Sequence, residues 1–247
     1  MVRKAAKSVP RRTGDAAGPI TLAIDVGGSG LKIQTLSPEG LPLSERLRVP
    51  TPEPATTTAI LTALDDLKVS VPLFDRVSVG FPGVIKQGKT LTAANLDPGW
   101  IDFPLAKTLE KRWGKPVRVA NDCAVQGYGV IQGKGVELVI TLGTGMGSAL
   151  FTEGVLCPGL ELGHHPWRKK TYEGYLGKRG LQKHGVKRWN KLLKRAIEQT
   201  EATFNWDTLY IGGGNSKKVT LKHGPDIKII SNEEGLLGAM ALWRDRQ

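Results

Sequence analysis

The sequence predicts a two-lobed α/β protein whose chemistry lies in a cleft between the lobes. At residues 20–36 a buried-strand pattern runs into a glycine-rich turn and then into a second strand, and the same device returns at residues 136–151. Around these two copies, strand patterns alternate with helical patterns, which is typical of sheets covered by helices. Two similar units this far apart in the chain are expected to face one another and to hold a phosphate group between them.

Length and composition indicate a globular protein. A chain of 247 residues can form one large domain or two modest lobes with a sizeable core. The formal net charge of +12 indicates an anionic partner, but nucleic acid, a membrane surface and polymeric phosphate all satisfy it. Cys123 and Cys157 have no paired spacing, so neither a disulfide framework nor a cysteine-type zinc site is indicated.

The N-terminus is predicted to be a flexible basic tail at residues 1–18, because it has too few large apolar side chains to order itself. The tail is either an inert extension or a segment that binds an anionic substrate weakly. No apolar run approaches the roughly 18 residues that cross a bilayer, and no apolar core of a secretory signal follows the basic residues. We therefore expect a cytoplasmic protein without a membrane partner.

The first lobe is assigned to residues 19–119 and begins with the hairpin. A buried strand at residues 20–25 leads into Gly27, Gly28, Ser29 and Gly30, and residues 31–36 alternate as the second strand. Glycines let backbone N–H groups approach an anion closely, so this turn suggests a bound phosphate. It is not a dinucleotide fingerprint, because a strand rather than a helix follows it.

The rest of the first lobe is predicted to alternate helix and strand. Residues 56–67 carry a core-facing helical stripe, and residues 76–84 read as a strand that ends in a Gly-x-Pro-Gly turn with Gly83 as its last glycine. That turn either only ends the strand or brings the backbone close to a sugar ring. A helix at residues 104–113 follows, closed by Gly114.

Asp122 is predicted to be the centre of the chemistry. Val117 and Val119 alternate as in a short strand, and the chain then turns through Asn121 and Asp122 into a helix-compatible segment. A carboxylate at the end of a strand is well placed to take a proton. On the local sequence alone Asp122 could equally be the N-cap of the following helix, and both interpretations stay open here.

The second lobe is assigned to residues 120–247, with a C-terminal helix at 233–247 that can pack back on the first lobe. A strand at residues 136–142 runs into the second glycine turn, and a third glycine turn follows a strand at residues 208–211. Glu161 and His164 are three residues apart and would share a face on a helical turn. Zinc binding would need further ligands that the sequence does not offer nearby, so hydrogen bonding to a polar substrate is preferred.

The segment from Arg168 to Arg195 is the densest basic stretch, with eleven Lys or Arg and a single acid, Glu173. Apolar residues from Val186 to Ile197 recur at helical spacing, which predicts an amphipathic helix with a positive outer face. A solvated face is the ordinary explanation for such charge. The shortage of acids for local pairing favours a functional track for an anion instead.

Four motifs in order make the chain resemble the ROK family of sugar kinases, within the actin-like ATPase fold. They are DVGGSGLK at 25–32, AND at 120–122, LGTGMG at 142–147 and ELGH at 161–164. The resemblance covers residues 20–243 and is greatest to the polyphosphate glucokinase branch. One departure from most ATP-using members is the run PWRKK at 166–170, which replaces a cysteine-rich zinc motif. No zinc is expected for this reason.

The resemblance implies a role for each matched residue. Asp122 is implied to be the general base that takes the proton from the sugar 6-hydroxyl, and Asp25 to lie near a Mg²⁺ ion. The implied sugar contacts are Gly83, Asn95, Asn121, Glu161, His164 and, less directly, Glu173. The implied phosphate contacts are Gly27, Gly28, Ser29, Gly30, Lys32, Gly143, Thr144, Gly145, Gly213, Gly214 and Lys217.

The resemblance also implies the reaction, which is transfer of a phosphoryl group from inorganic polyphosphate to glucose O6. Such transfer asks mainly for alignment and charge stabilisation, which glycine-turn amides, lysines and Mg²⁺ supply. One alternative is an ATP-dependent or dual-donor ROK hexokinase or glucomannokinase. A more distant one is a ROK-type DNA-binding regulator, for which residues 1–18 are too short and too polar to supply a helix-turn-helix. We expect no nucleic-acid partner, and a homodimer.

Overall fold

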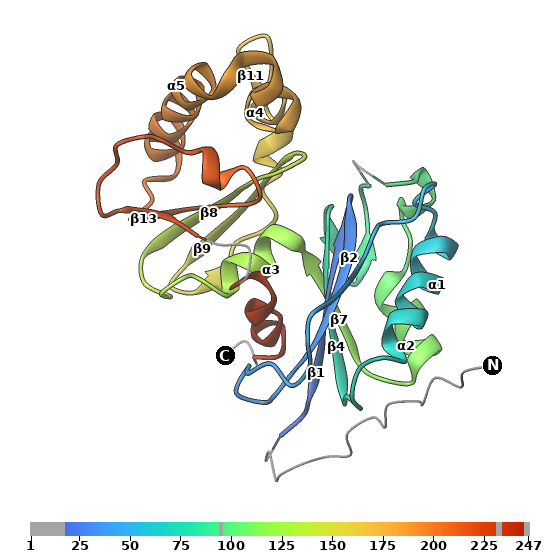
Figure 1. Ribbon diagram of the computed structural model, residues 1–247. Helices are drawn as coiled ribbons and strands as arrows, with labels where there is room; N and C mark the ends of the chain where they lie inside the picture. Colours follow the sequence, from blue (N-terminus) through green and yellow to red (C-terminus); the bar gives the residue numbers. More distant parts are fainter. Residues whose placement is uncertain (1–17, 94–95, 231–233, 245–247) are drawn as a thin grey trace, which may run out of the picture.

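The computed structural model describes residues 18–93, 96–230 and 234–244. Most of the predicted basic tail, the predicted sugar contact Asn95 and the ends of the predicted C-terminal helix lie outside these residues. Two five-stranded sheets organise the described chain, in the orders β3-β2-β1-β4-β7 and β10-β9-β8-β13-β14. Each sheet lies in its own lobe, and the helix α3 (Asp122–Tyr128) lies between them (Figure 1). The predicted two-lobed fold is confirmed.

The first sheet is built on the predicted hairpin. Its strands β1 and β2 pair antiparallel, with Asp25 opposite Lys32, whereas β1 and β4 and then β4 and β7 pair parallel. Parallel strands place their carboxyl ends at the same edge, so the ends of β1, β4 and β7 meet there. The strands of this sheet are β1 (Thr21–Gly27), β2 (Gly30–Leu36), β3 (Leu47–Val49), β4 (Arg76–Phe81) and β7 (Val117–Asn121).

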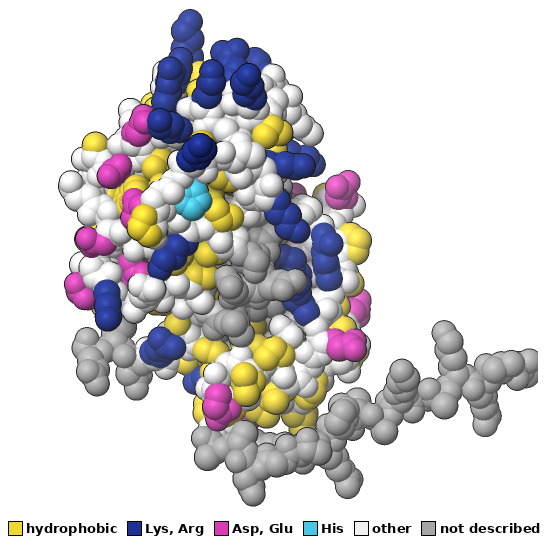
Figure 2. Space-filling view, turned by 60° about the vertical axis from the view of Figure 1, so that its left-hand side comes forward, with side chains coloured by type: hydrophobic (Ala, Val, Ile, Leu, Met, Phe, Trp, Pro, Cys, Tyr) yellow, Lys and Arg dark blue, Asp and Glu magenta, His cyan; other side chains and the backbone are white. Residues whose placement is uncertain are grey.

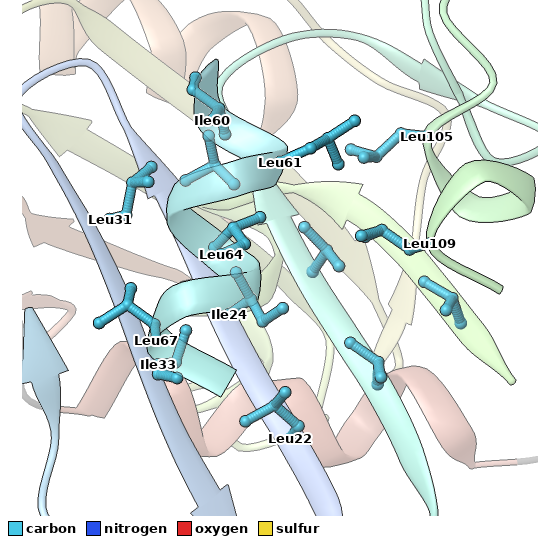
Figure 3. Close-up of a cluster of buried hydrophobic side chains, with 14 of the residues drawn as sticks. Leu22, Ile24, Leu31, Ile33, Ile60, Leu61, Leu64, Leu67, Leu105 and Leu109 are labelled. Carbon is cyan, nitrogen blue, oxygen red and sulfur yellow. The ribbon is translucent and has the colours of Figure 1, made fainter. Parts of the chain in front are cut away.

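Two helices, α1 (Thr57–Lys68) and α2 (Leu105–Trp113), cover one face of this sheet. Thr56 caps α1 by accepting from the N–H of Ala59, and Gly114 ends α2 in the left-handed conformation. Figure 3 shows the resulting core, with leucines and isoleucines of β1, β2, α1 and α2 in contact. Burying each such side chain contributes about 1.5–3 kcal/mol, so this core holds the first lobe rigid behind the cleft.

Three short elements complete the first lobe. A small hairpin joins β5 (Ile85–Lys86) to β6 (Lys89–Thr90), and η1 (Pro98–Trp100) precedes α2. The indole of Trp100 is fully buried and donates to the carbonyl oxygen of Ala55 at 2.9 Å.

The second sheet repeats the pairing of the first. The strands β8 and β9 pair antiparallel around the second glycine turn, and β8 then pairs parallel with β13. This repetition is what the two copies of the strand, turn and strand pattern predict. The strands of this sheet are β8 (Val136–Leu142), β9 (Met146–Thr152), β10 (Val155–Leu156), β13 (Thr208–Gly212) and β14 (Ile227–Ile229).

The basic segment forms two helices, α4 (Tyr172–Leu176) and α5 (Lys178–Phe204). The amphipathic helix is therefore longer than the sequence pattern predicts, and Gly185 interrupts it with a non-helical backbone at φ 68°. Val186 was expected in the apolar stripe, but it follows this break and is 41% exposed. The rest of the stripe, from Trp189 to Ile197, is buried against the second sheet. Smaller elements nearby are η2 (Leu162–His164), β11 (Pro166–Trp167), β12 (Lys170–Thr171) and η3 (Ser216–Lys218).

The predicted C-terminal helix appears as η4 (Glu234–Trp243), which has the 3₁₀ form. It returns to the first sheet, where the buried hydroxyl of Ser78 donates to the carbonyl of Ala239 at 2.7 Å and accepts from Trp243 Nε1 at 2.8 Å. Ala239 is buried against Val125 of α3. The segment thus ties α3 to the first sheet. None of the helices in the described ranges is long and apolar enough to cross a membrane.

Candidate active site

A cavity of about 260 Å³ lies between the two sheets, where the three glycine turns converge. Most of the residues predicted for the site line it. They are Asp25, Gly27, Gly28, Ser29, Lys32, Gly83, Asn121, Asp122, Gly143, Thr144, Gly145, Glu161, His164, Glu173, Gly213 and Gly214. Gly30 and Lys217 do not line it, although each belongs to or borders one of the turns.

Asp122 is the first residue of α3 and follows the last residue of β7. Asn121, not Asp122, is the N-cap residue, because its Oδ1 accepts from the N–H groups of Cys123 at 2.9 Å and Ala124 at 3.4 Å. Asp122 Oδ1 accepts from the N–H of Cys123 at 2.8 Å. The neighbouring asparagine therefore provides the cap, and the second oxygen of the aspartate remains available in the cavity.

The carboxyl of Asp122 is unusually basic for an aspartate. Its pKa is raised from 3.8 to about 7, first by burial and then by the nearby carboxylates of Asp25 and Glu161, while the N–H of Cys123 acts to lower it. A carboxylate with a pKa near 7 is matched to proton abstraction at neutral pH. Its two acidic neighbours come from different lobes, so Asp122 lies where the lobes meet.

Asn121 also ties the site to the turn after β4. Its Nδ2 donates to the carbonyl oxygen of Gly83 at 3.1 Å. With both lone pairs of its oxygen used in capping, one N–H of the amide remains for a ligand. Gly83 itself has a structural reason to be glycine, since a Cβ there would lie 2.3 Å from the carbonyl oxygen of Thr92.

A chain of polar contacts runs along the second lobe from Glu161 to the second glycine turn. His164 Nδ1 lies 3.3 Å from Glu161 Oε2, and its Nε2 lies 3.9 Å from Glu173 Oε2. The same oxygen of Glu173 accepts from the N–H of Met146 at 3.1 Å. Glu173 thus touches both the predicted sugar contacts and the turn predicted to hold the phosphate donor. About a third to a half of each of these three side chains is exposed to the cleft.

The first glycine turn carries one ion pair, between Lys32 Nζ and Asp25 Oδ2 at 2.6 Å. Both residues line the cavity, where Arg46 joins them. The carboxylate is 24% exposed and the lysine 31% exposed, so a ligand can reach either group.

The second and third turns are fixed by the chain around them. The carbonyl of Gly143 accepts from the N–H of Lys178, the first residue of α5, at 2.9 Å and from Asn215 Nδ2 at 3.0 Å. Gly213 has φ 86°, and a Cβ on it would lie 2.4 Å from the carbonyl oxygen of Leu142. The helix α5 therefore begins at the second turn, and the positive end of its dipole favours an anion there.

Comparison with known families decides the relationship that these motifs suggest. A family model described as the ROK family matches residues 21–184. The chain belongs to the ROK family.

Several ROK relatives are similar over nearly the whole chain. The polyphosphate glucokinase of Mycobacterium tuberculosis (strain CDC 1551 / Oshkosh) is 29% identical over 234 residues, which cover 87% of this chain and 88% of that protein. The crystal structure of an inorganic polyphosphate/ATP-glucomannokinase from Arthrobacter sp. strain KM is 33% identical, with a TM-score of 0.83 over 91% of this chain and 98% of that one. A ROK family glucokinase from Streptomyces griseus shares the fold, with a TM-score of 0.72 at 22% identity over 90% and 98% of the two chains.

Metal ligands are sparse in this ROK protein. No group of three His, Cys, Asp or Glu side chains that could hold a metal ion occurs among the described residues. Asp25 is the carboxylate at the first glycine turn, and Lys32 already contacts it. The donor set therefore fits a hard divalent cation that arrives with the phosphates and takes most of its oxygen ligands from them.

The cavity of the ROK protein also contains residues that the motifs do not include. Arg46, Thr92, Gln126 and Thr141 line it. Thr141 is the polar residue in the apolar run at residues 138–142 of β8, and that interruption is a signal in the sequence. Arg46 has no comparable signal, because it reaches the cavity through the pairing of β3 with β2.

Proposed function

We propose that this protein transfers the terminal phosphoryl group of inorganic polyphosphate to the 6-hydroxyl of glucose, giving glucose 6-phosphate. The observation that carries the proposal is the position of Asp122. Its carboxyl has a pKa of about 7 and lies in a cavity that three glycine turns also line. A base and a set of backbone N–H groups around one cavity suit the attack of an alcohol on a phosphoryl group.

In this proposal glucose lies between Asn121, at the end of β7 in the first sheet, and the pair Glu161 and His164 beside the second sheet. The free N–H of Asn121 and the exposed edges of Glu161 and His164 suit sugar hydroxyls. Asp122 takes the proton of the 6-hydroxyl as that oxygen attacks the terminal phosphorus, and the bond to the next phosphate breaks. The remaining polyphosphate leaves one unit shorter.

The amides of the first and second glycine turns stabilise the charge on the transferred group, and Lys32 adds a positive charge beside the first turn. Mg²⁺ is the proposed ion, held by Asp25 and by the donor, and its chemistry is to neutralise phosphate charge. Divalent cations of this kind fit the sparse protein ligands described above.

The charge of the second lobe supports a polymeric donor. All eleven Lys and Arg side chains between Arg168 and Arg195 are exposed, and among the described residues only Lys194 has a carboxylate partner, Glu198 at 3.8 Å. Figure 2 shows Lys and Arg side chains gathered over the end of the molecule where Figure 1 places α4 and α5. Because α5 begins at the second turn, this charge starts at the cavity. A chain of phosphates can use it, whereas ATP needs only a local cluster and an adenine pocket.

A second candidate keeps the chemistry and widens the substrates, as a dual-donor glucomannokinase. The specific support is the similarity to the Arthrobacter protein, whose name includes both polyphosphate and ATP and both sugars. The two candidates share Asp122 as the base and differ in how strictly the cleft selects donor and acceptor.

Initial rates with purified protein separate these candidates. Polyphosphate and ATP are compared at equal terminal-phosphate concentration, each with glucose and with mannose, in the presence of Mg²⁺. We expect the higher kcat/KM with polyphosphate and glucose, and a KM for polyphosphate that rises steeply with salt. Equal rates with ATP support the dual-donor enzyme. Turnover with ATP but not with polyphosphate contradicts the polyphosphate proposal, as does a KM for polyphosphate that does not change with salt concentration.

A further inference from the structure

Two arginines of the first lobe lie beside the first glycine turn without any role in the site described so far. The strand register places Asp25 opposite Lys32 and Lys32 opposite Arg48, so these three residues form one row across β1, β2 and β3. Arg46 comes two residues before Arg48, and side chains two apart on extended chain point to the same face. This face of the sheet is the one that lines the cleft, because Asp25 and Lys32 both line the cavity.

Each arginine contacts the mouth of the site in its own way. Arg46 lines the cavity together with Ser29 and Lys32. Arg48 lies over the turn, since its Nε would be 2.8 Å from a Cβ placed on Gly30. The absence of a side chain at Gly30 is therefore what lets the guanidinium group of Arg48 cover the turn.

Neither guanidinium group has its charge balanced by the protein. Both arginines are exposed, and in the described ranges neither forms an ion pair with a carboxylate. Lys32 differs, because Asp25 holds its ammonium group at 2.6 Å. Two unpaired guanidinium groups beside a phosphate-type turn suit further phosphate groups, which they can bind through paired N–H donors.

We propose that Arg46 and Arg48 bind the phosphate groups of the donor that immediately follow the transferred one. This inference rests on the proposed function. The donor then leaves the cavity over β2 and β3 of the first lobe. The cations of α5 act only on the more distant units of a long chain.

The competing route leads over the second lobe, where Lys178 and Arg179 begin α5 at the second turn. The two routes differ in which side chains bind a short donor. Tripolyphosphate has two phosphates beyond the transferred one, so the proposed route predicts that the arginines bind it. The competing route predicts that the first cations of α5 bind it instead.

The experiment compares Arg46→Gln/Arg48→Gln, Lys178→Gln/Arg179→Gln and the control Lys134→Gln, an exposed lysine that does not line the cavity. The dissociation constant of tripolyphosphate is measured by calorimetry with Mg²⁺, and its KM at saturating glucose. Loss of charge-assisted hydrogen bonds should raise both constants at least about tenfold in the Arg46/Arg48 variant. The dissociation constant of glucose, measured without donor, should match that of the wild type in this variant.

Two results would overturn the proposal. One is an Arg46/Arg48 variant that binds tripolyphosphate as tightly as the Lys134→Gln control. The other is a larger loss in the Lys178/Arg179 variant than in the arginine variant. In either case wild-type turnover with polyphosphate leaves the proposed function standing, whereas a wild type with no turnover on any phosphate donor refutes the function itself.

Discussion

Substitution Asp122→Asn should make the protein more stable at neutral pH while it removes the base. The native carboxyl has a pKa of about 7, against 3.8 as its ordinary value. A group whose pKa is raised by folding stabilises the native state below its unfolded pKa, and this stabilisation is lost as the pH rises through the folded pKa. The shift of about three units corresponds to about 4 kcal/mol of unfolding free energy once Asp122 is fully ionised.

The asparagine variant has no such loss, so the difference between the two proteins must change with pH. Linkage with these two pKa values predicts that the wild type loses roughly 2 to 3 kcal/mol relative to Asp122→Asn between about pH 5 and about pH 8. Urea unfolding of both proteins at several pH values in this range measures the difference, and the titrating groups that do not interact with Asp122 cancel. A difference that stays constant over the range would refute the raised pKa.

The same carboxyl predicts the pH dependence of activity. With a pKa of about 7 in the free enzyme, kcat/KM for glucose should rise about tenfold from about pH 6 to about pH 8 as the base ionises. Asp122→Asn should bind glucose but lose about 10² to 10⁴ in kcat, without the acid limb. Unchanged kcat in the variant would remove Asp122 from the mechanism.

Three further substitutions test the surroundings of the base. Gly213→Ala should lower the free energy of unfolding by about 1 to 3 kcal/mol in urea titrations, because its φ of 86° and its contact with Leu142 leave no room for a Cβ. Gly143→Ala is the control, since a Cβ there meets nothing within 4 Å, and its free energy of unfolding should stay near that of the wild type. Glu173→Gln should raise the KM of both glucose and the donor, since its carboxylate touches His164 and the Met146 N–H, and a rise for glucose alone would contradict that link. Trp243→Phe should lower the free energy of unfolding, also measured in urea, by about 1 kcal/mol, because the hydrogen bond to the buried hydroxyl of Ser78 is lost. An unchanged free energy of unfolding would refute the anchoring role of η4.

Local sequence patterns predict much of the fold because they report alternation and glycine directly. The two hairpins around Gly28 and Gly145 were readable from apolar runs that stop at glycines, and the helix ending at Gly114 from its cap. These features depend on neighbours within a few residues. The family motifs add the order of the turns, which leads to the prediction that they surround one cavity.

Features that depend on contacts distant in sequence were not predictable in this way. Arg46 reaches the cavity only because β3 adds to β2, and the three residues of β3 give little periodicity to read. The break at Gly185 lies immediately before the predicted stripe, so the exposure of Val186 follows from a backbone angle that the apolar pattern does not encode. The contacts of η4 with Val125 and Ser78 likewise join residues more than a hundred positions apart, which no local pattern reports.

The hydrogen bonds that Asn121 accepts at the start of α3 help Asp122 to keep its raised pKa. Asn121 Oδ1 shares the N–H of Cys123 with Asp122 Oδ1 and also accepts from the N–H of Ala124, so the aspartate receives only part of the hydrogen bonding at this helix end. Hydrogen bonds to a carboxylate stabilise its charged form and lower its pKa. In Asn121→Ala the N–H of Cys123 donates to Asp122 alone, so the acid limb of kcat/KM should move below pH 7 while kcat falls, because the carboxylate is held more firmly at the helix. An acid limb that stays at about pH 7 in this variant would show that the asparagine does not protect the base. Asn121→Ser provides the matched control, because a serine hydroxyl also caps a helix and adds no charge beside Asp122.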